Sequence, residues 1–110
     1  MNAKAVEVLV AAALKGTPQT TGMFVDGDAR CALGVLGEAM GLQMAGETTY
    51  PAALSMRYGF SARPSRCAEC GYHAFAEDRL IAHLNDEHRW DFLQIARKLG
   101  PGGRGPASSA

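Results

Sequence analysis

The chain has 110 residues, and its 11 Lys and Arg are balanced by 11 Asp and Glu, so the formal net charge is zero. This length fits one domain with a core of marginal size, and the charge balance excludes both a global basic field for nucleic acid and an acidic tail. The apolar content of 47% is ordinary for a folded protein, and no apolar run is long enough to span a membrane.

The first predicted element is an amphipathic helix that is capped by Asn2 and ends near Lys15. Its apolar residues follow the i, i+3, i+4, i+7 spacing of one helical face. They are Val6, Leu9, Val10, Ala13 and Leu14. Gly16 stands where a C-terminal cap belongs, and Pro18 follows it. This apolar segment slightly mimics an export signal, but Glu7 within it favours a helix of a cytoplasmic protein.

A small β-hairpin is predicted next. Residues 20–25 are rich in β-formers, Asp26-Gly27-Asp28 is a turn signal, and residues 29–31 form a brief second arm.

A glycine-bearing helix is predicted over residues 31–40, ending near Gly41. Its apolar face is marked by Leu33, Leu36 and Met40. Gly34 and Gly37 cost helix propensity, about 1 kcal/mol each. Glycines one turn apart on an apolar helix therefore predict that another element packs close to the backbone here.

The middle of the chain has weaker signals. Residues 43–49 are expected to form a loop, and residues 51–58 a short helix with Pro51 at its first position. Gly59 would end that helix, and residues 61–65 would lead in extended form to the next segment.

A helix is predicted over residues 76–87, with Leu80, Ile81 and Leu84 on its apolar face. The last helix follows at once: Asp91 is an N-cap with Gln94 three residues later, which is a capping-box pattern. Trp90 and Ile95 occupy the positions of a hydrophobic staple. The buried stripe of this helix should comprise Phe92, Ile95, Ala96 and Leu99. Residues 100–110 are rich in Gly, Pro and Ser and are expected to form a flexible tail.

Residues 67–88 carry the strongest chemical signal of the chain. Cys67 and Cys70 are separated by two residues, twelve residues follow to His83, and four more to His88. This C-x2-C…H-x4-H spacing is typical of a structural zinc site, because thiolates and imidazoles suit Zn²⁺ at tetrahedral geometry. Gly71 fits the positive φ that a metal-binding knuckle often needs. Residues 67–88 are therefore predicted to form a zinc-binding element.

Alternative roles remain open for the third histidine, His73, and the third cysteine, Cys31. His73 is a substitute ligand for one of the two distal imidazoles, or else a solvent-exposed turn residue. Cys31 opens a predicted helix, where the N-terminal field would lower its pKa and make it a nucleophile; the other interpretation is a small buried core thiol. Because three cysteines are an odd number, a zinc pair and one free thiol fit better than a disulfide framework and indicate a reducing compartment.

The zinc-binding element resembles a single C2H2 zinc finger. Leu80 stands where that family has its core leucine, whereas the aromatic is displaced by one position, to Phe75. The family's base-reading positions fall on Ala76, Arg79 and Ala82, which make a poor reader of DNA. Glu77 and Asp78 beside them would repel phosphate, so the resemblance implies the metal site without DNA recognition.

A second resemblance is broader. Gly22-Met-Phe, Cys31-Ala-Leu-Gly and the run from Leu84-Asn-Asp to Leu99 are similar to segments of small uncharacterised proteins of actinobacteria and their phages. The resemblance implies a compact cytoplasmic accessory protein without an established activity. Many of those proteins lack the Cys-x2-Cys pair, which implies that zinc substitutes here for other core packing.

Together these features predict an α-rich α+β fold with one compact domain over residues 1–99. Its core is expected to contain Val6, Leu9, Val10, Leu14, Leu33, Leu36, Leu80, Leu84, Trp90, Phe92, Ile95 and Leu99.

The predicted function is that of a zinc-stabilised, non-enzymatic interaction protein with a protein partner, without a membrane or a small-molecule substrate. The alternative is a nucleic-acid-binding regulator that uses a helix-turn-helix-like pair over residues 76–99. Its predicted contacts are Arg79, Arg89, Gln94, Arg97 and Lys98.

Overall fold

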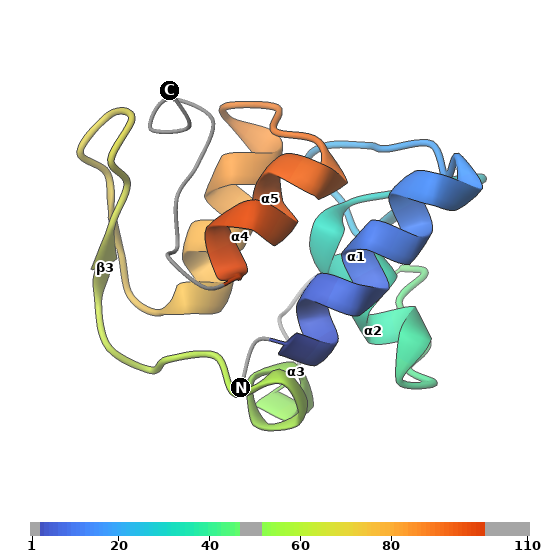
Figure 1. The fold of residues 1–110 in the computed structure, drawn as a ribbon, viewed down its shortest axis with the longest axis horizontal. Helices are drawn as coiled ribbons and strands as arrows, with labels where there is room; N and C mark the ends of the chain where they lie inside the picture. The colour runs from blue at the N-terminus through green and yellow to red at the C-terminus, as the bar shows by residue number, and fades with distance from the viewer. Residues whose placement is uncertain (1–2, 47–51, 101–110) are drawn as a thin grey trace.

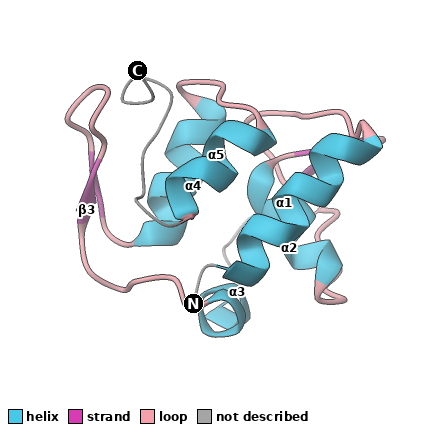
Figure 2. Ribbon diagram, in the orientation of Figure 1, coloured by secondary structure: helices cyan, strands magenta, loops and turns pink. Residues whose placement is uncertain are grey.

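The computed structural model describes residues 3–46 and 52–100, and it has the α-rich α+β fold that was predicted (Figure 1, Figure 2). The helices are α1 (Ala3–Lys15), α2 (Ala32–Ala39), α3 (Ala52–Tyr58), α4 (Glu77–Asp86) and α5 (Phe92–Leu99). The strands are β1 (Val25–Asp26), β2 (Ala29–Arg30), β3 (Ser65–Arg66) and β4 (His73–Ala74). The predicted cap Asn2, the predicted first helical residue Pro51 and most of the predicted tail lie outside the described residues.

The helices form the core and the two hairpins lie at its edges. α1 packs against α5 and α2, and α2 also contacts α4. The β3–β4 hairpin lies on the opposite side of the molecule from α1 and α2 (Figure 1). Each hairpin is antiparallel, with Val25 opposite Arg30 in the first and Ser65 opposite Ala74 in the second. None of the helices within residues 3–46 and 52–100 has the length and hydropathy needed to cross a membrane.

The close approach predicted at the glycines of α2 is confirmed. A Cβ atom at Gly34 would overlap the carbonyl oxygen of Phe24, and one at Gly37 would lie 2.7 Å from Cγ of Met44. Only a residue without a side chain leaves room for the backbone of Phe24 at this point. The predicted turns are also confirmed, since Gly16 and Gly27 have φ angles of +78° and +60°.

The buried face of α1 differs from the predicted one. Leu14, expected in the core, is 81% exposed, whereas Ala5 and Ala12 are buried with Leu9. Val6 and Val10 are only partly buried. Because α1 packs against both α2 and α5, its buried stripe is centred on small residues that allow close packing, and Leu14 lies on the opposite side of the helix.

One further expectation needs correction in the second half of the chain. Residues 61–65 were expected only to lead in extended form to the cysteines, but Ser65 begins the second hairpin. The predicted helix over residues 76–87 is confirmed, since α4 spans Glu77–Asp86 with Ala76 and Glu87 as its caps, and His88 lies in the turn before α5. The other predicted core residues are buried, and so are residues that the sequence did not single out. These include Phe24, Met44, Leu54, Tyr58 and Phe60.

Candidate metal centre

The β3–β4 hairpin positions the two thiols. At its tip, Cys67 N donates a hydrogen bond to Tyr72 O at 2.8 Å, and Gly71 N donates to Cys67 O at 2.8 Å. Gly71 has a φ of +80°, as predicted for a metal-binding knuckle. These bonds fold residues 67–72 into a tight turn that directs Cys67 and Cys70 toward α4.

The two imidazoles come from α4 and from the turn that follows it. His83 lies on α4. Its carbonyl oxygen accepts a hydrogen bond from Glu87 N at 2.8 Å, which closes the helix. Arg89 then adopts a φ of +53°, a left-handed conformation that is uncommon outside glycine. The chain thus reverses directly after His88. This ending of the helix allows two histidines five positions apart to face the same point.

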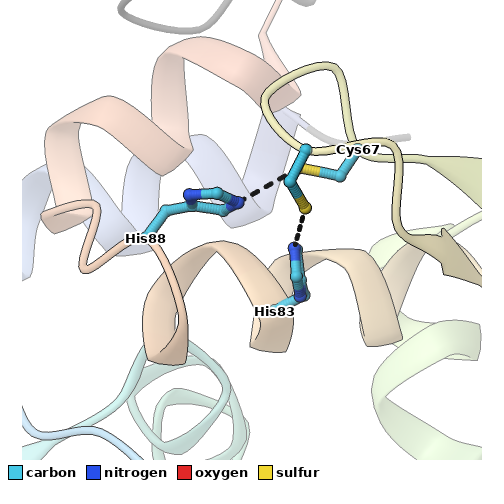
Figure 3. Close-up of side chains that lie close together, drawn as sticks. Cys67, His83 and His88 are labelled. Carbon is cyan, nitrogen blue, oxygen red and sulfur yellow. Dashed lines mark hydrogen bonds between the residues drawn. The ribbon is translucent and has the colours of Figure 1, made fainter.

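The four side chains converge. Nε2 of His83 lies 3.3 Å from Sγ of Cys70, and Nε2 of His88 lies 3.4 Å from Sγ of Cys67 (Figure 3). All four ligand atoms lie within 4.8 Å of one another. A tetrahedral ion with metal–sulfur and metal–nitrogen bonds of about 2.3 and 2.0 Å separates its S and N ligands by about 3.5 Å. The arrangement of these atoms therefore fits a bound metal ion.

Neighbouring groups favour both the orientation and the neutral form of the His83 ring. Tyr72 stacks on His83 with a centroid distance of 4.3 Å and an interplanar angle of 13°. Burial, followed by the neighbouring His88, lowers the pKa of His83. A lowered pKa keeps the ring neutral at neutral pH, and only a neutral imidazole nitrogen can bind a metal. Cys67 is buried, both imidazoles are partly exposed and Cys70 is exposed, so the group lies at the surface.

The two alternative residues do not join this group. His73, considered as a substitute ligand, is exposed on β4. Cys31 is 6% exposed at the N-cap of α2, and its Sγ accepts a hydrogen bond from Gly34 N at 3.3 Å. Burial is the largest effect on this thiol and raises its pKa, opposite to the lowering expected from the helix field. Desolvation outweighs the helix N-terminus because the charged thiolate loses its water. Cys31 is thus a buried core thiol.

The predicted nucleic-acid contacts are spread over α4, the turn and α5. Arg79, Arg89 and Arg97 are exposed, and Lys98 is partly buried. Gln94 is occupied, because its Oε1 accepts a hydrogen bond from Asp91 N at 2.8 Å in the predicted capping box.

Asn85 is a structurally central residue that the sequence analysis missed. It is 1% exposed and makes four hydrogen bonds. Its Oδ1 accepts from Gln19 Nε2 at 2.8 Å and from Ala32 N at 3.0 Å, while its Nδ2 donates to Thr20 O at 2.9 Å and to Asp86 Oδ1 at 2.8 Å. Asn85 thereby anchors the histidine-bearing helix to the N-terminal half. The signal available in the sequence was a polar residue next to Leu84 on an apolar helix face.

Comparison with protein-family models, curated proteins and solved structures finds no match for this chain. The resemblances to a C2H2 finger and to the actinobacterial and phage proteins therefore stay predictions. The geometry of Cys67, Cys70, His83 and His88, which could hold a metal ion, is therefore the main indication of function.

Proposed function

We propose that this protein is a small zinc-stabilised interaction module, in which Cys67, Cys70, His83 and His88 hold one Zn²⁺. The convergence of these four ligand atoms within 4.8 Å is the observation that carries the proposal. Two thiolates and two imidazoles form a donor set of intermediate softness that suits Zn²⁺, and harder ions such as Mg²⁺ or Ca²⁺ prefer oxygen ligands.

The proposed role of the ion is structural. Four protein ligands complete a tetrahedral shell, which leaves no coordination position for a substrate or an activated water. Two thiolates also balance the charge of the dication, so the loaded site would be neutral at the surface of the protein. The ion would then join the β3–β4 hairpin to α4.

The hairpin is the part of the chain that most needs such a cross-link. Of residues 61–76, only Cys67 and Ala74 are buried. By analogy with zinc-finger peptides, the ion would contribute on the order of 10 kcal/mol to folding at neutral pH. We propose that the hairpin so held, together with α4, presents a binding surface to a macromolecular partner in the bacterial cytoplasm.

Nucleic-acid binding through α4 and α5 is a second candidate. The observation that favours it is that Arg89 and Arg97 are exposed and form no ion pair with any residue in the described ranges. The helix N-terminus of α5 is less suited to base contacts, because Gln94 is part of its capping box.

The test of the zinc site is substitution of one exposed ligand. We expect Cys70→Ser to abolish stoichiometric zinc, measured by elemental analysis, and to abolish the cooperative thermal transition at the same time. Cys31→Ser is the matched control, because it removes a thiol that is not part of the cluster, and it should retain one zinc ion per chain. Retention of both zinc and cooperative melting by Cys70→Ser would refute the site.

A further inference from the structure

The β3–β4 hairpin has an outward face that its metal does not use. In its register, Ser65 pairs with Ala74 and Arg66 pairs with His73. Ala74 is 1% exposed and marks the inward face, so Arg66 and His73, one residue along each strand, point outward. Phe75 follows His73 by two residues, in the bend between β4 and α4. We call Arg66, His73 and Phe75 the outer row.

The ring of Phe75 is unusually open. Phe75 is 79% exposed, whereas the neighbouring exposed aromatic, Tyr72, stacks on His83. A phenyl group held in water on a short hairpin gains nothing for the fold, because it removes little apolar surface from solvent. Such a ring is available to stack against a planar group of a ligand.

The same hairpin region carries two exposed arginines, Arg63 and Arg66. The guanidinium of Arg66 lies near the knuckle, because a Cβ atom placed on Gly71 would be 3.4 Å from its Nη2. Arg63, also exposed, lies two residues before the strand. Neither arginine forms an ion pair with any residue in the described ranges, where Arg30–Glu38 is the ion pair present. The nearby carboxylates are Glu69, in the knuckle, and Glu77, whose Oε1 accepts a hydrogen bond from Ser61 N at 2.8 Å.

We propose that the outer row binds single-stranded nucleic acid, with a base stacked on Phe75 and the adjoining phosphates bound by Arg66 and Arg63. An exposed aromatic and unpaired arginines on one hairpin suit a single strand, because every unpaired base has a free face and successive nucleotides each carry a phosphate. The stacked bases of a duplex offer no such face. The proposal rests on the zinc-stabilised module, because the ion holds the hairpin in place, and it is separate from the surface of α4 and α5.

The test is fluorescence anisotropy of a labelled 12-nucleotide oligo(dT) with the full, zinc-loaded chain at low salt. We expect saturable binding that weakens with salt, with a log–log slope of about −1.4 for two phosphates neutralised on a single strand. Phe75→Ala should weaken binding about tenfold, the effect of losing one stacked base. Arg66→Ala should weaken binding and make the slope shallower by about 0.7.

The chain offers matched controls on the opposite side of the molecule. Leu14, 81% exposed on α1, matches the apolar exposure of Phe75, and the exposed Lys15 matches the charge of Arg66. Leu14→Ala and Lys15→Ala should bind the oligonucleotide as the unmodified chain does. Equal loss in Phe75→Ala and Leu14→Ala would overturn the proposal, as would no binding at all.

Two further measurements separate the remaining outcomes. Tighter binding of a 12-base-pair duplex, or displacement of oligo(dT) by an equal charge of an oligoglutamate peptide, would overturn the proposal in favour of a duplex or an acidic protein. Zinc content is determined for every sample. A chain that holds zinc but binds no single strand overturns this inference alone, whereas a chain that holds no zinc overturns the proposed function.

Discussion

Helix α2 and the β3–β4 hairpin show two different ways in which this chain is held together. Six consecutive residues at the start of α2, 32–37, are buried, because other elements surround the helix. In residues 61–76 only Cys67 and Ala74 are buried, and Cys67 belongs to the group of four that could hold a metal ion. Apolar burial contributes roughly 25 cal/mol per Å², so α2 is stabilised by packing, whereas the hairpin has little area to gain. The difference indicates that the hairpin has little packing of its own, so that a metal ion held by the four-residue group would matter far more to the hairpin than to α2.

The largest expected effect is loss of the metal. Chelation of zinc should bring the amide protons of Cys67 and Gly71 to the exchange rates of an unfolded chain, because their hydrogen bonds lie inside the knuckle. The loss, on the order of 10 kcal/mol, is comparable with the whole stability of a small domain, so the cooperative melt should disappear as well. Hydrogen exchange followed by mass spectrometry measures the first effect, and re-addition of zinc is the control. Unchanged protection of the knuckle in verified metal-free protein would show that packing suffices for the hairpin.

The next effect concerns the packing of α2. Gly34→Ala should destabilise the fold by about 3 kcal/mol, because the new methyl group meets the backbone of Phe24, which cannot move away easily. Gly37→Ala is the matched variant, since its methyl group meets the flexible side chain of Met44 and gains about 1 kcal/mol of helix propensity. Its net effect should be near zero. Denaturant unfolding of both variants measures the difference, and equal stabilities would argue against the close approach of Phe24.

Asn85 joins α4 to the start of α2 and to Thr20, and its loss should cost about as much as a packing defect. Asn85→Ala leaves Ala32 N without its acceptor and Thr20 O without its donor, inside the protein. Buried groups left without partners cost about 1–3 kcal/mol each, so a loss of about 3 kcal/mol is expected in denaturant unfolding. Gln43→Ala, which removes an exposed amide, should leave the stability unchanged. A similar result for both variants would contradict the anchoring role of Asn85.

The smallest effect is that of a local cap. Asp91→Ala removes the acceptor for Gln94 N at 2.8 Å and should lower the free energy of unfolding by about 1 kcal/mol. Asp91→Asn retains a capping oxygen and should be nearly neutral. If the alanine and asparagine variants are equally stable by thermal unfolding, the capping box contributes nothing measurable.

Features that depend on short-range interactions could be predicted from the sequence, whereas features that depend on contacts between distant segments could not. The hairpin turn at Gly27, the close approach at Gly34 and the capping box of Asp91 and Gln94 were predicted correctly, because each depends on neighbours within a few positions or on the absence of a side chain. The burial of Leu14 was predicted wrongly. Periodicity identifies an apolar stripe, but it does not say which side of the helix meets α2 and α5.

The sequence by itself determined the chemistry of the candidate site, since the identity and spacing of Cys67, Cys70, His83 and His88 are sufficient to indicate a metal-binding group. Only the tertiary structure decided how that group is supported: by the left-handed turn at Arg89, by the stacking of Tyr72 on His83, and by Asn85, which bonds to Gln19, 66 positions away. The physical reason is that ligand preference belongs to the side chains themselves, whereas support arises from contacts between segments that meet only when the chain is folded.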